Sequence, residues 1–111
     1  MRERTKAFAY RIVRLFRALP RTAEGQVIGR QLLRSGTAVA ANYRAVCRAR
    51  SKAEFVARMG VVVEEADETV FWLELVSDNG ILPKQRMDGL LNEAKELTAI
   101  FTASRQTARH R

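Results

Sequence analysis

Apolar side chains recur every three or four residues along four long segments of this 111-residue chain. That spacing places side chains on one face of an α-helix. With two prolines and six glycines, the chain holds little that would interrupt a helix. The pattern predicts an all-α protein. We expect residues 1–111 to form one domain, an antiparallel up-down-up-down four-helix bundle, with residues 106–111 as a frayed basic tail.

Local signals set the ends of the predicted helices. The helices are expected at residues 5–19, 23–50, 52–78 and 84–105. Pro20 should end the first helix, because a residue before proline avoids helical backbone. Thr22 can cap the second helix, and Ser51 and Glu54 have the spacing of a capping box for the third. Gly80 can adopt the left-handed conformation that closes the third helix.

Charge is distributed unevenly along the chain, which has a formal net charge of +8. Residues 1–50 carry +10 (12 Lys and Arg, two Asp and Glu), and residues 51–83 carry −5 (two against seven). Residues 84–111 carry +3 (six against three). This asymmetry predicts basic and acidic surfaces that meet within one chain or between chains.

Arginines on the first two helices form a candidate nucleic-acid-binding surface. Basic faces attract phosphate backbones, and 20 basic residues exceed the 12 acids that could pair with them. The candidates are Arg4, Arg11, Arg14, Arg17, Arg30 and Arg34. The expected partner is RNA or DNA, with RNA first. In the alternative, the arginines pair with acids of the third helix, and the chain is a protein-protein assembly or accessory module without direct nucleic-acid binding.

The segment from Val61 to Leu75, VVVEEADETVFWLEL, places acids inside the most apolar part of the chain. On a helical wheel, Glu64 and Glu68 fall opposite the core, among apolar residues. The outer face of the second helix presents arginines beside alanines, and an arginine matches a carboxylate in bidentate geometry. We therefore expect these two faces to join copies of the chain.

The candidate interface residues of this homo-oligomer are Arg44, Arg48, Glu64, Glu68, Phe71, Trp72 and Leu75. The three apolar side chains among them should be exposed in an isolated chain and buried in the assembly. Alternatively, the acidic run is a solvated helix face with local ion pairs. The clustered aromatic residues favour a contact surface.

Two polar residues, Ser35 and Asn42, lie on the predicted core face of the second helix. A polar core residue often fixes the register of a bundle. A functional alternative is a buried hydrogen-bond network that joins Asn42 to Ser35 or to Arg50.

The sequence contains no pattern typical of an enzyme. The only histidine, His110, lies in the tail, so Cys47 lacks a partner for nucleophilic catalysis and the carboxylates lack the histidines of a di-metal bundle. We expect no metal, no cofactor and no catalytic activity. No apolar run is long enough to span a bilayer, and no secretory signal is evident. A cytoplasmic location and no membrane partner are therefore expected.

A set of spaced residues in the second and third helices gives a family resemblance. These are Arg34-Ser35, Asn42, Ser51, Glu54-Phe55, Glu68 and Leu73. Their order and spacing resemble the four-helix-bundle family named after the 23S rRNA intervening sequence protein. The chain departs from many members at Ala45-Val46, where they carry Glu-Gly, and at Glu64-Glu65, where they carry a small residue and Ser.

The resemblance implies an antiparallel bundle that assembles into a ring, a pentamer, without enzymatic activity. Some members are encoded within inserts in 23S rRNA genes. Similar proteins act as accessory factors of diversity-generating retroelements, where they bind nucleic acid and a reverse transcriptase.

Overall fold

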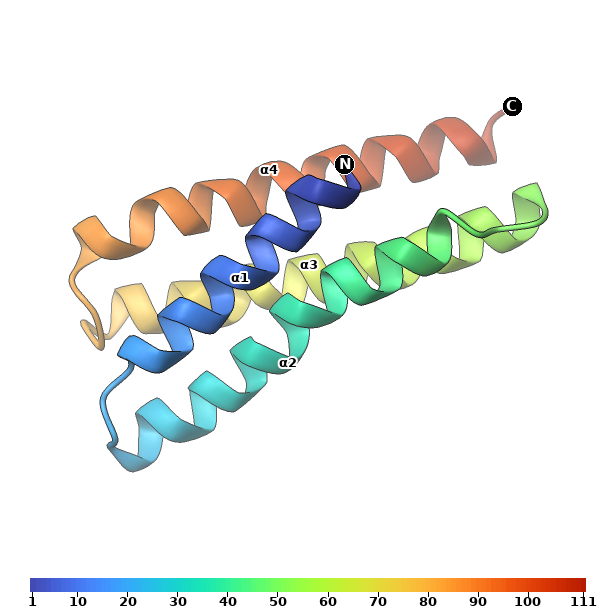
Figure 1. Cartoon of the computed structure of the whole chain (residues 1–111). Helices are drawn as coiled ribbons and strands as arrows, with labels where there is room; N and C mark the ends of the chain where they lie inside the picture. The colour runs from blue at the N-terminus through green and yellow to red at the C-terminus, as the bar shows by residue number, and fades with distance from the viewer.

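The computed structural model describes the whole chain, residues 1–111, as four helices. They are α1 (Arg2–Ala18), α2 (Ala23–Val46), α3 (Lys52–Asp78) and α4 (Lys84–Arg109). Each helix runs antiparallel to the one before it, so the bundle is up-down-up-down and about 46 Å long (Figure 1). The predicted all-α four-helix bundle is confirmed.

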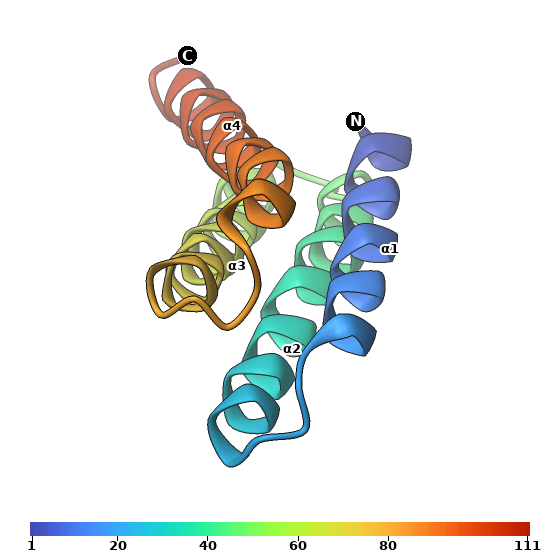
Figure 2. The same cartoon turned by 90° about the vertical axis from the view of Figure 1, so that its left-hand side faces the viewer.

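Each helix packs mainly against its neighbours in the sequence. The extensive contacts are between α1 and α2, α2 and α3, and α3 and α4, whereas α1 and α4 touch only sparsely. Figure 2 shows α1 lying along α2 and diverging from α4. At the start of α1, Arg4 reaches α4 and forms ion pairs with Glu93 and Glu96.

The predicted apolar faces meet in one core. The largest wholly buried side chains include Phe8, Ile12, Leu32, Leu73, Met87, Leu97 and Phe101. Two glycines let α1 approach α2 closely. A Cβ atom on Gly36 would lie 2.7 Å from Cγ1 of Ile12, and one on Gly29 would lie 2.8 Å from Cδ1 of Leu19. Glycine destabilises a helix interior, and at these two positions it allows α1 and α2 to pack closely in return.

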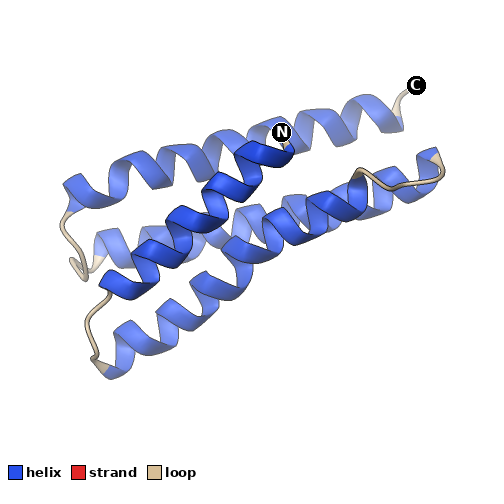
Figure 3. Cartoon of the chain, viewed as in Figure 1, coloured by secondary structure: helices blue, strands red, loops and turns tan.

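The short connections follow the predicted signals (Figure 3). Leu19 has extended backbone before Pro20, although α1 begins at residue 2 rather than 5 and ends at residue 18 rather than 19. The hydroxyl of Thr22 caps α2 by accepting a hydrogen bond from the backbone N–H of Gly25, at 3.1 Å. Gly80 has φ +64° and follows the end of α3.

The prediction that the second helix continues to residue 50 was wrong, because α2 ends at Val46. Ser51 is the N-cap of α3, and its hydroxyl accepts a hydrogen bond from the backbone N–H of Glu54 at 3.1 Å. This cap requires an extended backbone at Ser51 (φ −151°), so the chain leaves α2 before residue 50. Only this half of the predicted capping box forms. The carboxylate of Glu54 accepts the backbone N–H of Arg50 at 3.2 Å instead of that of Ser51.

The last helix extends beyond the predicted residue 105, to Arg109, so most of the expected tail is helical. Two contacts hold this end against the start of α3. Nε of Arg105 donates to the carbonyl of Val56 at 3.0 Å, and Nζ of Lys52 donates to the carbonyl of Arg111.

Candidate functional site

Arg34 joins α2 to α3 through two acids of the segment from Val61 to Leu75. Its Nη1 lies 3.1 Å from Oε2 of Glu65, and its Nη2 forms an ion pair with Glu68. Nε1 of Trp72 also donates to Glu68, at 3.0 Å. The Glu68 hydrogen bond is the main cause that raises the pKa of Arg34. Glu68 therefore has partners within its own chain, and Arg34 is not free as a nucleic-acid-binding residue.

Next to Arg34 and Glu68 in the sequence, Ser35 of α2 and Thr69 of α3 form a buried pair. Their hydroxyl oxygens lie 2.9 Å apart, and both residues are wholly buried. The hydroxyl of Thr69 also donates to the carbonyl of Glu65, at 2.7 Å. Asn42 is half-buried and donates to the carbonyl of Ala38 in its own helix, at 2.8 Å. The proposed network of Asn42 with Ser35 or Arg50 does not form. Thr69, which was not predicted from the sequence, is the interhelical partner of Ser35, whose hydroxyl oxygen also lies 3.4 Å from the carbonyl oxygen of Leu32.

The outer face of α3 is less exposed than its sequence indicates. Glu64 is exposed, and Phe71 is 51% exposed with its ring edge-to-face on Trp72, at a centroid distance of 4.9 Å. Trp72 and Leu75 are half-buried in the single chain, and Trp72 packs against the core. The expected exposure of all three apolar side chains therefore holds only for Phe71.

Two of the six predicted nucleic-acid contacts are occupied, since Arg4, like Arg34, forms ion pairs with acids of this chain. Nη2 of Arg4 lies 2.7 Å from Glu93 and 3.0 Å from Glu96. The hydrogen bond from Arg4 lowers the pKa of Glu93 below its ordinary value. Arg11 is exposed beside α4, where a Cβ on Gly89 would lie 3.4 Å from its Nη2.

The remaining three predicted contacts, Arg14, Arg17 and Arg30, are exposed and form no ion pair. Their guanidinium groups are available to a phosphate backbone.

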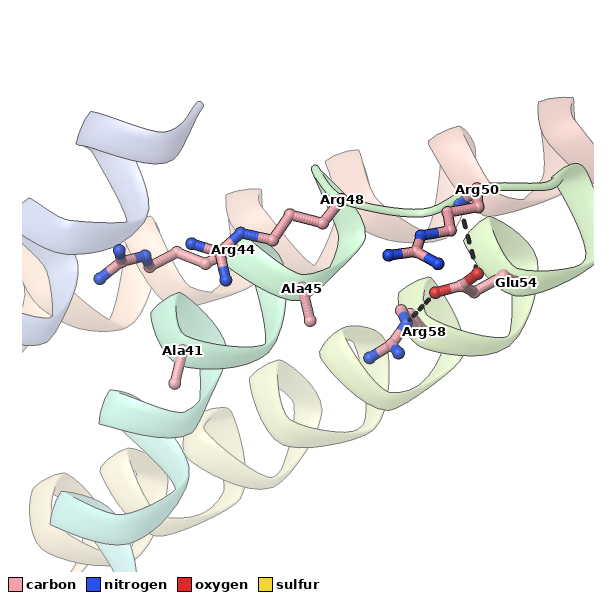
Figure 4. A pocket seen from close by; sticks show the side chains of 7 residues that line it. All are labelled: Ala41, Arg44, Ala45, Arg48, Arg50, Glu54 and Arg58. Atoms are coloured by element: carbon pink, nitrogen blue, oxygen red, sulfur yellow. Dashed lines mark hydrogen bonds and ion pairs between the residues drawn. The ribbon is translucent and has the colours of Figure 1, made fainter.

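A concentration of arginines surrounds a hollow where α2 gives way to α3, shown in Figure 4. We call it the arginine pocket; it has a volume of about 660 Å³. Its lining consists of Ala41, Arg44, Ala45, Arg48, Arg50, Glu54 and Arg58. Four arginines and one carboxylate thus line the hollow, a composition that suits an oxyanion. Arg44 and Arg48 were predicted from the sequence as residues of a subunit interface, whereas Arg58 was not predicted as a site residue.

The single carboxylate of the arginine pocket is already engaged. The carboxylate of Glu54 accepts a hydrogen bond from Nε of Arg58, at 2.9 Å, and another from the backbone N–H of Arg50, at 3.2 Å. The hydrogen bond from the backbone N–H of Arg50 is the main cause that lowers the pKa of Glu54, and the hydrogen bond from the Arg58 guanidinium lowers it further. Arg44 and Arg48 form no ion pair, so their charges are not neutralised by this chain.

A second hollow, which we call the Tyr10 groove, lies between the start of α1 and the end of α2. Its volume is about 1130 Å³, and it shares Ala41 and Arg44 with the arginine pocket. It is lined by Met1, Arg2, Glu3, Thr5, Lys6, Ala7, Tyr10, Ala40, Ala41, Tyr43, Arg44 and Cys47. Tyr10 is 53% exposed, and Nζ of Lys6 lies 5.8 Å from its ring centroid.

The other aromatic ring of the Tyr10 groove, that of Tyr43, faces the core. It packs against Phe101 with ring centroids 5.7 Å apart. Burial raises the pKa of the Tyr43 phenol, and the neighbouring Cys47 raises it further.

The structure shows neither a group of three side chains placed to hold a metal ion nor a helix long and apolar enough to cross a membrane. The protein is thus a small basic helical bundle with a largely unpaired arginine surface. It belongs to the family of 23S rRNA-intervening sequence proteins, whose model matches residues 1–103. The family resemblance seen in the sequence is confirmed.

A solved structure supports this assignment. A crystal structure of a protein of unknown function from the S23 ribosomal protein family of Bacteroides thetaiotaomicron VPI-5482 is similar, with a TM-score of 0.85 and 30% sequence identity. The match covers 92% of this chain and 94% of that one. No curated protein matches this chain.

Proposed function

We propose that this protein is a non-enzymatic homo-oligomeric bundle that binds nucleic acid, RNA first, through unpaired arginines. One observation carries the proposal: of 20 Lys and Arg residues, only Arg4, Arg34 and Arg58 form ion pairs with acids of the chain. The uncompensated charge is spread over exposed side chains that can displace counterions from a phosphate backbone.

RNA is the first nucleic acid to test because the family's name refers to an intervening sequence of 23S rRNA. The exposed, unpaired Cys47 fits a reducing compartment, so we place this function in the cytoplasm.

Self-association is supported by apolar exposure on α3. Val61 and Phe71 are 42% and 51% exposed in the single chain, and burial between copies would remove both from water. The family resemblance makes a pentameric ring the expected assembly. The same exposure favours the second candidate function, a module that binds only protein, such as a reverse transcriptase or another copy of itself.

Fluorescence anisotropy with labelled RNA over a range of salt concentrations tests the proposal. We expect binding that weakens steeply as salt rises, with a log-log slope near the number of phosphates contacted. The double variant Arg14→Glu/Arg17→Glu should bind more weakly and remain helical by circular dichroism, because both residues are exposed. Absence of binding at low salt would favour the protein-binding module.

A further inference from the structure

We infer that the arginine pocket and the Tyr10 groove form one continuous track for single-stranded nucleic acid. A backbone phosphate lies among the guanidinium groups of the pocket, and an unpaired base stacks on Tyr10. This inference rests on the proposed function and specifies which form of nucleic acid binds and where.

The arginine pocket has the composition of a phosphate site. In Figure 4, Arg44 and Arg48 project from the end of α2, while Arg50 and Arg58 come from the connection and from α3. Guanidinium groups bind phosphate oxygens through paired N–H donors, whereas the small side chains of Ala41 and Ala45 leave room for close approach.

A purely structural role does not explain the whole arginine pocket. Cations near the C-terminus of a helix are stabilised by its dipole, and this accounts for Arg44 and Arg48. Arg58 has a structural role as well, since it pairs with Glu54 four residues earlier in α3, at 2.9 Å. Arg50, in the connection, forms no ion pair and has neither role. Arg44, Arg48 and Arg50 are thus unpaired around one hollow whose single carboxylate is already engaged.

The subunit contact predicted from the sequence also competes poorly for these arginines. That contact required Glu64 and Glu68 to pair with Arg44 and Arg48 of another copy. Glu68 is instead bonded to Arg34 and Trp72 of its own chain, so only Glu64, which is exposed and forms no ion pair, is left for such a contact. One carboxylate does not neutralise two arginines, so a phosphate backbone is the better counter-charge for Arg44 and Arg48.

Tyr10 indicates a single strand rather than a duplex. Its ring is half exposed, and the ammonium group of Lys6 lies near it. Proteins that bind single strands use this combination of an aromatic stacking surface and positive charge. Bases of a duplex are stacked on one another and cannot reach such a ring without unpairing. Arg44 lines both hollows, so a backbone held in the arginine pocket continues directly into the Tyr10 groove.

Charge reversal tests the phosphate half of the track. Anisotropy is measured with a labelled single-stranded RNA, with single-stranded DNA of the same sequence, and with the RNA duplex. Arg44→Glu/Arg50→Glu should weaken single-strand binding at least tenfold more than Arg21→Glu/Arg86→Glu. The control makes the same change of charge at exposed, unpaired arginines near the opposite end of the bundle. Equal weakening by both pairs would overturn the inference and leave general electrostatic binding, and so the proposed function, intact.

Substitution of the ring tests the base-stacking half. Tyr10→Ala should weaken single-strand binding by roughly tenfold and leave duplex binding unchanged, because one stacked base is lost. Tyr10→Phe keeps the ring and should bind as the unaltered protein does. An equal effect of Tyr10→Ala on single strands and duplex, or none on either, would overturn the inference. If the unaltered protein bound no nucleic acid, both the inference and the proposed function would fail.

Discussion

At the scale of single residues, polar side chains decide how α2 and α3 fit together. The hydroxyls of Ser35 and Thr69 satisfy each other in the core, and Arg34 bridges Glu65 and Glu68 at its edge. A buried hydroxyl without a partner is costly, whereas an exposed one can bond to water. The buried pair therefore fixes the relative position of the two helices more strongly than the exposed ion pairs do.

Thr69→Val tests this pair. The substitution keeps the shape of the side chain and leaves the Ser35 hydroxyl only the carbonyl of Leu32 in its own helix, at 3.4 Å, so the free energy of unfolding should fall by about 1 kcal/mol. Urea denaturation followed by circular dichroism measures it. The matched control is Thr102→Val, because Thr102 makes the same kind of bond to the carbonyl of Thr98 at 2.7 Å but is exposed. Equal effects of the two variants would contradict a special role for the pair.

At the scale of helices, α1 depends on a close fit to α2 and on one charged contact with α4. Gly36 accepts the side chain of Ile12 where any larger residue would collide with it. Arg4 is the side chain that ties the start of α1 to α4 by ion pairs. Each of these contacts can be changed separately.

Gly36→Ala should destabilise the protein. Overpacking costs about 1–3 kcal/mol, partly offset by up to about 1 kcal/mol of better helix propensity. Gly89→Ala in α4 is the control, since its Cβ would lie at an ordinary 3.4 Å from Arg11 and should bring only the gain in propensity. Chemical denaturation of both variants decides the matter, and a stabilised Gly36→Ala protein would show that α1 can shift away from α2.

The contact of Arg4 with Glu93 should make the start of α1 sensitive to acid. Because the pKa of Glu93 is lowered in the folded protein, its contribution to stability is fully present above its ordinary value of 4.5. That contribution is lost as the pH falls from there through the lowered pKa. The protection of amide hydrogens in the first turns of α1, measured against the intrinsic exchange rate at each pH, should therefore fall in this range. Glu93→Gln should show faster exchange already at neutral pH and a weaker acid effect; an unaltered acid response would assign it to other carboxylates.

At the scale of the whole molecule, the sequence was sufficient for the bundle but not for the candidate site. Periodicity identifies core positions such as Ile12, Leu32 and Leu97 because each helix must bury its own apolar face. The end of α2 was missed because the cap at Ser51 outweighed a continuing apolar pattern. The ion pair of Arg34 with Glu68, and the position of Arg44 and Arg58 in one pocket, depend on how α2 is rotated and shifted along its axis relative to α3. The apolar pattern of a single helix contains no information on this rotation or this shift.

The assembly is tested by Phe71→Ser. If the outer face of α3 joins copies of the chain, loss of this aromatic side chain should reduce the sedimenting species to smaller ones while the helical content stays constant. Tyr10→Ser is the matched control, because Tyr10 is an aromatic residue of similar exposure, 53%, on α1 and so outside the two proposed faces of α2 and α3. Unchanged sedimentation of Phe71→Ser would show that this face is solvated.

The sparse contact between α1 and α4 has a consequence for synthesis and folding. Since almost all contacts join helices that follow one another in the sequence, the topology is local, and proteins of low contact order fold rapidly. A growing chain can pack α1 on α2 before α4 has left the ribosome, and each later helix then finds its partner already in place. Closure of α4 against the start of α1, through Arg4, is left as the final step.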